Sequence, residues 1–587
     1  MRNVFDNICY SPLNSELMFE PKEIDAAQGI LSSRVSIVII TLFVALVFLP
    51  IAFMGVPDGF DLMQHMRFAA AYHDAILSGD LIPKWSAWDN FGFGGIGIRY
   101  YPPLAYYVLA LTKIVTGSWY HSFWINTLFW GLLGSFGVYA WIREWTSERA
   151  ATIAAVAYAI VPYHTFQIYQ AVLYAEFAAS GILPFCFLFL TRLCRRRRWF
   201  DAVLFSISYS LLILTHIPTA IIATLCIGVY GLVIVDWREV KDTAIKVAAA
   251  VMMSGLAASF HLVRAITEVD WVKHNSPQFF GQGYYDYKSY FFPIYFSAPP
   301  DRYVQKMLWH FDTMIFFTVA FFALAIVARY LLKDRVSWAD QNAKFKRAIT
   351  LTGIFSLLML SIASSFLWNN VSLLAKIQFP WRWLSVASLM AAASFGIAAS
   401  VLLWRGNNLS RRFAYPIIFF VVVVTMYDIS QNIIPSTPLE KAGFDEKVAG
   451  MYDEEACECW WPIWGRQSAF ENREKVSAGA RTVDIASWNG TDREFSIGSG
   501  SEMNIRVATF YHPHWKAIVN GQARDISSGD DGTISISLPS ERSQVSLSFV
   551  EPNASYLARG ISLAAWIVLI VFLLIQSITR KRPEIIY

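Results

Sequence analysis

Two carboxylates and an imidazole lie close together just after the first apolar stretch of the sequence. Asp58, Asp61 and His65 follow a hydrophobic run that ends near Met54. A carboxylate at the outer end of a membrane span can act as a general base toward a hydroxyl, because partial loss of water adjusts its pKa. His65 would share a helical face with Asp61 and could orient it or contact a phosphate. An Asp that only caps a helix would have the same spacing, so both interpretations stay open.

A second group of residues holds an arginine between two indoles, in Phe379-Pro380-Trp381-Arg382-Trp383. The guanidinium of Arg382 is always charged and suits the geometry of a phosphate. Because Trp and Arg are also common at the depth of lipid headgroups, the segment can instead be an interfacial anchor. Lys84, Arg99 and Lys376 would add positive potential on the same side of the membrane.

Two further polar residues stand alone in apolar surroundings. Glu176 begins an apolar run, and an ionisable group at membrane depth is costly enough to suggest a function. His216 lies in a tight turn between two apolar runs, where a structural role in the turn is the simpler interpretation. The outer acidic residues do not have the spacing of metal ligands, so we predict no cofactor, and the need for a divalent cation stays open. The candidate catalytic residues are Asp61 and Asp58, and the candidate substrate-binding residues are His65, Lys84, Arg99, Glu176, His216 and Arg382.

The composition identifies the kind of protein that must position these residues. Of the 587 residues, 55% are hydrophobic and 16% are charged. A soluble chain carries about 25% charged residues, so this composition indicates a polytopic membrane protein. We find no Walker, zinc-protease, dinucleotide-binding or nucleophile-elbow motif, and the basic clusters are explained by membrane topology rather than by nucleic-acid binding.

Hydropathy predicts about twelve transmembrane helices. Basic clusters such as residues 195–198 are expected in the cytoplasm, and their positions require that residues 103–117 lie on the outer leaflet instead of crossing. Both termini are then cytoplasmic. The expected spans lie near residues 35–55, 121–142, 150–166, 177–194, 200–217, 219–235, 245–264, 311–332, 347–367, 384–404, 413–433 and 557–578.

The chain divides into four parts on this basis. From Thr482 onward apolar and polar residues alternate, and Asn520-Gly521 is a strong hairpin signal, which predicts a small antiparallel β-domain outside the membrane. Cys457 and Cys459 are expected to be free or loosely paired. The parts are a cytoplasmic leader (1–34), a transmembrane domain (35–433) with outer loops 56–120, 265–310 and 368–383, an outer domain (434–556) that is β-rich from about 482, and a final helix with a cytoplasmic tail (557–587).

Several of these motifs resemble known families. The acidic first outer loop and the following Pro102-Pro103-Leu104-Ala105-Tyr106-Tyr107 resemble the GT-C superfamily of membrane glycosyltransferases. Residues 61–65, 79–85, 101–103 and 379–382 together resemble a bacterial group named 6-pyruvoyl-tetrahydropterin-synthase-related membrane proteins, a name that we do not take as evidence of pterin chemistry. Residues 511–517 with Asn520-Gly521 are similar to the outer β-domain of YfhO-like membrane proteins.

The resemblance implies a GT-C-like fold and an inverting glycosyltransferase in the bacterial inner membrane, with its active site facing the periplasm. The donor would be a sugar on a polyprenyl phosphate or pyrophosphate. The acceptor would be a glycan, lipid or protein, as in cell-envelope glycan assembly. The resemblance also implies Asp61 or Asp58 as the base and Arg382 as the first choice for the donor phosphate. The acidic pair usual in the family is split here by Gly59-Phe60, which leaves the choice of base open, and Lys84 stands where the group more often carries Arg.

Two other functions remain open at the level of sequence. A transporter or flippase for a lipid-linked glycan predicts charges along a path between the leaflets. Most charges here lie at the ends of the expected spans. A non-catalytic membrane assembly protein would use the β-domain as its binding module. The sequence names neither the sugar, the polyprenyl length, the acceptor nor the oligomeric state.

Overall fold

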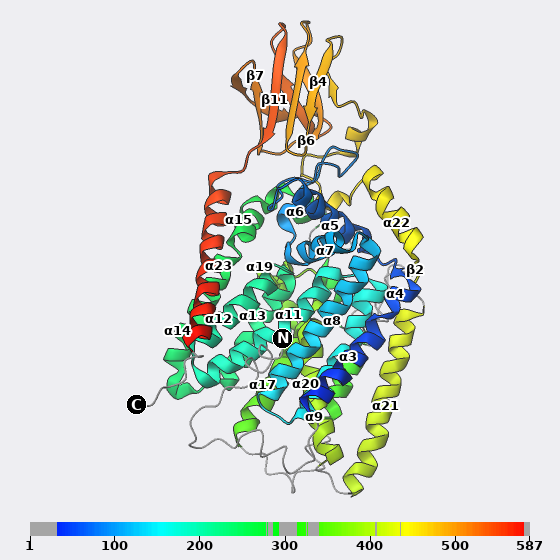
Figure 1. The fold of residues 1–587 in the computed structure, drawn as a ribbon, viewed down its shortest axis with the longest axis vertical. Coiled ribbons are helices and arrows are strands. Elements are labelled where there is room, and N and C mark those ends of the chain that lie inside the picture. Colours follow the sequence, from blue (N-terminus) through cyan, green and yellow to red (C-terminus); the bar gives the residue numbers. More distant parts are fainter. Residues whose placement is uncertain are drawn as a thin grey trace.

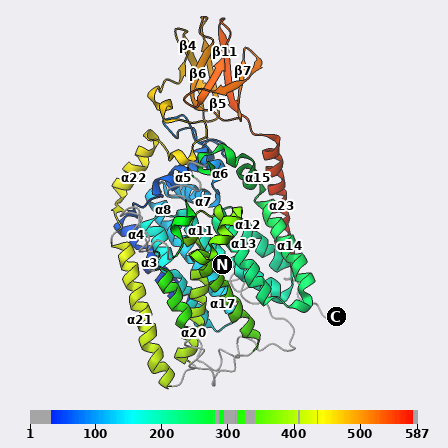
Figure 2. The same cartoon turned by 180° about the vertical axis from the view of Figure 1, so that it is seen from behind.

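The computed structural model combines a helical bundle with two small sheets stacked beyond one end of it (Figure 1). The same arrangement is seen from behind in Figure 2. The structure describes residues 32–579, except for residues 277–278, 280–285, 293–310, 312–313, 325, 327–339, 405–407 and 435. Of the expected span near 311–332, Met314–Leu324 forms an apolar helix shorter than a span, and residues 327–332 lie outside the described residues. Residues 280–285 and 293–310 of loop 265–310 also lie outside them.

Six helices of the described part are long and apolar enough to cross a membrane. A bent pair, Trp237–Ala257 with Ser259–Trp271, would make a seventh span, and its two halves meet at 73°. The structure confirms a polytopic helical membrane protein, but it does not confirm the predicted count of twelve. The six are Ser33–Met54 (α3 with α4), Trp119–Arg143 (α8), Tyr174–Arg196 (α11), Ile217–Ile234 (α13), Pro380–Leu403 (mainly α20, Leu384–Trp404) and Asn553–Ile578 (α23, Asn553–Thr579).

Further helices complete the bundle and its end nearest the sheets. Three of them, α5, α6 and α7, gather at the end nearest the sheets (Figure 1). At 13 residues α7 is only about 20 Å long, which is too short for the ~30 Å hydrocarbon core. The remaining α-helices are α5 (Leu62–Leu77), α6 (Gly97–Tyr100), α7 (Leu104–Thr116), α9 (Glu148–Ala159), α10 (Pro162–Thr165), α12 (Trp199–Ile213), α14 (Val240–Ala257), α15 (Ser259–Glu268), α17 (Asp340–Leu360), α18 (Ser365–Asn370), α19 (Ser372–Ala375), α21 (Asn408–Ile433) and α22 (Lys441–Gly450).

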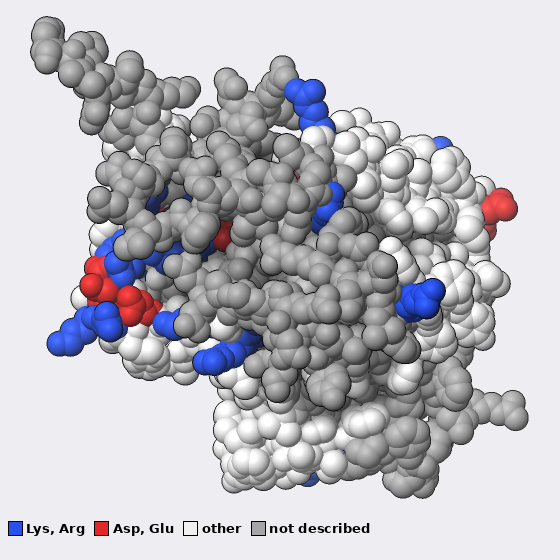
Figure 3. Space-filling model, turned by 90° about the horizontal axis from the view of Figure 1, so that it is seen from below, with Lys and Arg blue, Asp and Glu red and all other residues white. Residues whose placement is uncertain are grey.

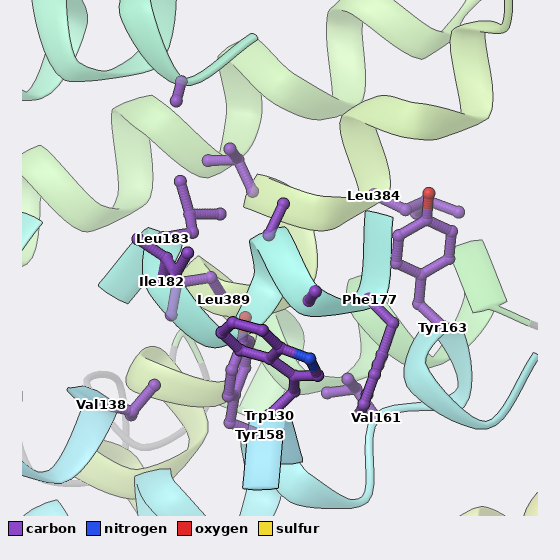
Figure 4. Close-up of a cluster of buried hydrophobic side chains, with 14 of the residues drawn as sticks. Trp130, Val138, Tyr158, Val161, Tyr163, Phe177, Ile182, Leu183, Leu384 and Leu389 are labelled. Atoms are coloured by element: carbon purple, nitrogen blue, oxygen red, sulfur yellow. The ribbon is translucent and has the colours of Figure 1, made fainter. Parts of the chain in front are cut away.

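The core of the bundle lies where α8, α9, α11 and α20 meet. Aromatic and aliphatic side chains such as Trp130, Tyr158 and Leu183 pack together there (Figure 4). Small residues let the helices approach closely. A Cβ atom on Gly396 of α20 would lie 2.5 Å from the backbone nitrogen of Ala154 in α9, so this crossing requires glycine.

The two ends of α11 differ in charge. The helix runs over Tyr174–Arg196, and Glu176 and Arg196 lie about 30 Å apart along it. At the basic end Arg192, Arg195 and Arg196 surround Glu144. Where its residues are described, the end of the molecule farthest from the sheets shows more Lys and Arg than Asp and Glu (Figure 3). The Arg196 end of α11 therefore has the positive charge expected of the cytoplasmic side.

The outer domain contains two antiparallel sheets, as the alternation of the sequence predicts. Their inner faces bury residues such as Phe495, Val507 and Val545. Asn520 and Gly521 both have positive φ (52° and 81°) and form the predicted hairpin turn. One sheet has the order β4-β5-β11-β7-β8 (Val483–Trp488, Asp492–Ile497, Ser543–Phe549, Trp515–Val519, Gln522–Arg524), and the other has the order β3-β6-β10-β9 (Val476–Ser477, Asn504–Phe510, Thr533–Ser537, Ile526–Ser528).

The segment between α22 and the sheets corrects one expectation. Cys457 and Cys459 form a disulfide, so the prediction that they are free or loosely paired is wrong. A short 3-10 turn, Glu458–Trp460, separates their Cα atoms by only 5.2 Å, which is within the usual range for a disulfide.

Candidate functional site

Asp61 lies at the junction between the first outer loop and α5. The loop is held by strand β1 (Val56–Pro57), which pairs with β2 (Pro438–Leu439) after α21. Gly59 packs so closely on the chain that a Cβ atom there would lie 2.8 Å from the carbonyl oxygen of Gln170. This contact explains why a glycine separates the two acidic residues. The backbone N–H of Asp61 then donates to the carbonyl of Ala171 at 3.1 Å.

The Asp61 carboxylate has no partner among the described residues. It caps no backbone N–H of α5, and it makes no ion pair or side-chain hydrogen bond there. The residue is exposed, yet the surrounding protein reduces the hydration of the carboxyl. Loss of hydration raises the pKa of Asp61 to about 6, while the charge of Arg382 opposes the rise and that of Glu176 adds to it.

Arg382 faces the same region from the turn that begins α20. Its Nη1 donates to the carbonyl of Ile377 at 2.7 Å and to Oε1 of Gln378 at 3.0 Å. Its Nε donates to Glu176 at 3.2 Å, and its Cζ lies 5.0 Å from the centre of the Phe379 ring. Within the described residues the other terminal nitrogen, Nη2, has no hydrogen-bond partner. A permanently charged donor is therefore available near an unpaired carboxylate.

Glu176 serves as a partner of Arg382. Its carboxylate is buried, and it accepts hydrogen bonds from the hydroxyl of Tyr163 and from Nε2 of Gln167 at 3.2 Å. Gln167 lies in a π-helical turn, Phe166–Gln170, and such turns are frequent at functional sites. In the structure the Glu176 carboxylate pairs with Arg382 and helps to hold its guanidinium in place.

Two histidines and a tyrosine complete the surroundings of Asp61. His65 is buried, its Nδ1 lies 2.7 Å from the Tyr106 hydroxyl, and burial lowers its pKa to about 3. His216 caps α13, because its Nδ1 accepts a hydrogen bond from the backbone N–H of Thr219 at 3.4 Å. The proton of the neutral ring therefore lies on Nε2. Tyr101 lies among the charges, because Arg382, Asp61 and Glu176 all influence its pKa, which burial raises.

Three predicted site residues lie elsewhere. Asp58 forms an ion pair with Lys447 of α22, at 2.6 and 2.7 Å. Arg99 has no exposed surface and donates to Glu268, Glu551 and the carbonyl of Lys84. Arg99 is therefore a structural residue in this structure rather than a substrate contact, and Lys84 lies beside it.

Sequence reasoning missed several partners of the site. Gln378 directly precedes the Phe379–Trp383 motif, and this position was its only signal. Tyr163 and Gln167 lie at the edge of an apolar run that the sequence presents as a span, so nothing marked them as polar partners. Among the described residues, no three His, Cys, Asp or Glu side chains lie close enough together to hold a metal ion.

A comparison with protein families decides the classification of the chain. Residues 98–434, more than half of the sequence, match the family described as "6-pyruvoyl-tetrahydropterin synthase related domain; membrane protein". The chain belongs to this family. The matched region of the family includes Glu176, His216 and Arg382 but not Asp61. The sequence matched no curated protein.

Solved structures show only a distant likeness. The chain is similar to the apo oligosaccharyltransferase of Archaeoglobus fulgidus (13% identity, TM-score 0.40, 70% of this chain and 57% of that one). It is also similar to ArnT from Cupriavidus metallidurans (16%, 0.28, 63% and 79%) and to the arabinosyltransferase EmbB from Mycobacterium smegmatis (11%, 0.34, 93% and 64%). The chain thus spans less than two thirds of the oligosaccharyltransferase and of EmbB. At these scores nothing about activity follows.

Proposed function

We propose that this family member is a glycosyltransferase that takes a sugar from a polyprenyl-phosphate or polyprenyl-pyrophosphate donor. Its acceptor would be a hydroxyl-bearing or amide-bearing glycan, lipid or protein on the extracytoplasmic side. The observation that carries the proposal is that an unpaired Asp61 carboxylate and an Arg382 guanidinium with an unused Nη2 donor interact electrostatically. The charge of Arg382 acts on the Asp61 carboxyl, so the two groups lie within electrostatic reach of each other.

These two groups have complementary roles in such a reaction. Asp61 accepts the proton of the acceptor, whose oxygen or nitrogen attacks the anomeric carbon. The bond between that carbon and the phosphate oxygen breaks, and its electron pair leaves with the phosphate, next to the positive charge of Arg382. The attack and the departure occur on opposite faces, so the anomeric configuration inverts. A base whose pKa is about 6 is mostly deprotonated at neutral pH and still accepts a proton readily.

Two independent features support an extracytoplasmic site. The disulfide Cys457–Cys459 lies in the outer segment, and disulfides persist in oxidising compartments. The cluster of Arg192, Arg195 and Arg196 lies at the opposite end of α11 from Glu176, as the positive-inside rule requires.

The base is Asp61 rather than Asp58 in this proposal. Asp58 is already neutralised by Lys447, whereas Asp61 is unpaired and close to Arg382. A transporter would need charged groups along the bundle. The charges described for this site instead gather at the outer ends of α11 and α20.

The test is transfer from a radiolabelled polyprenyl-phosphate sugar by the purified protein in lipid. We expect Asp61→Asn to reduce kcat by about 10²–10⁴-fold, the usual contribution of a general base. The matched control, Asp58→Asn, should keep kcat within about twofold. Donor binding should persist in Asp61→Asn. Full transfer by this variant would eliminate the proposed base, and donor binding without turnover by the wild type would favour a non-catalytic assembly protein.

A further inference from the structure

Three segments that are far apart in the sequence meet beside Arg382. They are the turn before α20 (377–382), the segment after α15 (271–276) and the outer segment that contains the disulfide (456–463). The last two are joined in an antiparallel bridge, Val272 to Pro462. The backbone N–H of Lys273 donates to the carbonyl of Trp461 at 3.0 Å, and that of Ile463 donates to Trp271 at 3.0 Å.

Gln378 connects the first two segments and has an unusual backbone. Its φ is +69°, in the left-handed region that favours glycine and is strained for other residues. Both the oxygen and the nitrogen of its side-chain amide form hydrogen bonds. Oε1 accepts from Nη1 of Arg382 at 3.0 Å, and the amide nitrogen lies 2.6 Å from Nε2 of His274. Because a guanidinium can only donate, the Gln378 oxygen must face Arg382, and its NH₂ group therefore donates to the imidazole.

His274 and Trp460 continue the contact to the outer segment. The neutral ring of His274 can accept this hydrogen bond, since burial and the charges of Arg382 and Lys376 lower its pKa to about 4. The ring is stacked on Trp460, with centroids 4.5 Å apart and planes 7° from parallel. The edge of Trp460 contacts Tyr101, at 5.6 Å between centroids.

The turn that carries Trp460 is itself constrained. The disulfide closes it on the N-terminal side, and the backbone N–H of Trp460 donates to the carbonyl of Cys457 at 2.9 Å. An ion pair joins Glu458 to Lys273. The outer segment is therefore fixed against the same strand-like segment that contains His274.

We infer that Gln378 is a positioning residue that aims the unpaired Nη2 of Arg382 at the donor phosphate, and that the outer segment holds Gln378 in this role through Trp460 and His274. The guanidinium is planar, so holding Nε with Glu176 and Nη1 with Gln378 sets the direction of Nη2. This inference rests on the proposed function, because it assigns the phosphate to Arg382. It adds that donor affinity depends on a segment outside the region that matches the family.

The backbone conformation of Gln378 allows its effect on stability to be separated from its effect on donor binding. Substitution by Gly or by Ala removes the same two side-chain hydrogen bonds, but only Gly adopts a φ of +69° without strain. We expect Gln378→Gly to melt at a higher temperature than Gln378→Ala, while both lose donor affinity equally. A purely structural role would make the more stable variant also the better binder.

The experiment measures the Kd of a polyprenyl phosphate without turnover, and KM and kcat for transfer, on the full-length protein. Losing a hydrogen bond to a charged group corresponds to about tenfold to a hundredfold in binding. We expect Gln378→Ala to raise Kd and donor KM by about this factor and to leave kcat within about twofold. Gln544→Ala, on the outer face of β11, is the matched control and should change neither.

A second pair of variants tests the connection to the outer segment. His274→Gln keeps an acceptor for the Gln378 amide and should bind the donor nearly as the wild type does. His274→Leu should resemble Gln378→Ala. If the wild type binds a polyprenyl phosphate and Gln378→Ala binds it equally well, this inference is overturned and the proposed function survives. If the wild type binds none, the proposed function itself has failed, and this inference with it.

Discussion

Two arginine–carboxylate clusters at the outer end of the bundle differ in one respect. Around Arg99, Glu268 of α15 and Glu551 after β11 accept hydrogen bonds at 2.6 to 3.3 Å, and Arg99 has no exposed surface. Around Arg382, Nη2 and the Asp61 carboxylate stay unpaired in the described part of the chain. Both clusters contain the same residue types. The difference teaches that unused hydrogen-bonding capacity, rather than the presence of charge, distinguishes a site from a structural joint.

The cluster around Arg99, in which every charged group has a partner, joins the β-domain to the helices. Glu268 also lies 2.9 Å from Nε2 of His514, which precedes β7. Glu551 is shared with Arg264, at 2.8 Å, and lies between the last strand and α23. Its position explains why the arginine that sequence analysis assigned to the substrate is instead used to fix the outer domain.

Substitution of Arg99 and of Arg382 should give the largest difference between the clusters, in protein stability and in donor KM respectively. Arg99→Gln leaves Glu268 and Glu551 without their main partner, and breaking a buried ion pair costs roughly 3–5 kcal/mol of unfolding free energy. The donor KM of the protein that remains folded should be unchanged. Arg382→Gln should instead raise the donor KM by about 10²-fold, the effect of removing one preorganised charge.

Denaturant unfolding in detergent and donor titrations measure the two quantities. If Arg99→Gln raised the donor KM as much as Arg382→Gln did, Arg99 would belong to the site after all.

The second prediction concerns the pH dependence of transfer. Because Asp61 must be deprotonated to accept a proton, kcat/KM should rise with pH through about 6 and level off above it. Asp61→Asn should keep a low rate with no step in this window. A step in the wild type near pH 4 would mean that the carboxyl that titrates is an ordinary exposed one.

The third prediction uses the opposite signs of two pKa shifts. Burial raises the pKa of Glu551, but hydrogen bonds and charge from Arg99, with help from Arg264, lower it to about 2. Its stabilisation is therefore present above about pH 4.5 and is lost as the pH falls toward 2. The raised pKa of Asp61 works the other way, because its ionised form destabilises the fold as the pH rises from 3.8 through about 6.

Melting curves across pH distinguish the two groups. Glu551→Gln should lower the melting temperature at pH 7 and flatten the loss of stability in acid. Asp61→Asn should raise the melting temperature at pH 7.5 and have no effect near pH 3.5. Equal behaviour of the two variants would remove the distinction between the clusters.

The smallest effect is expected at Asp58. Its ion pair with Lys447 is partly exposed, and such pairs contribute about 0–1 kcal/mol. A double-mutant cycle with Asp58→Asn and Lys447→Gln should therefore give a coupling energy below about 1 kcal/mol and little change in transfer. A large loss of kcat in Asp58→Asn alone would reopen the choice of base.

Sequence analysis predicted the local features well. The β-domain followed from alternating residues and from Asn520-Gly521, whose positive φ values suit a hairpin turn. The motif around Arg382 was recognised as a permanently charged group between two indoles. The number of spans was not confirmed, because apolar runs near 200–217 and 413–433 form helices that are shorter or less apolar than a span requires over their described residues.

The sequence by itself determined which segments are apolar, where the sheet pattern begins and which residues carry charge, because these properties are local in the chain. Only the tertiary structure decided which charges are saturated. The partners of Arg99 lie 169 and 452 residues away, and that of Asp58 lies 389 residues away. Whether a buried donor is satisfied depends on contacts between remote segments, and sequence spacing carries no record of such contacts.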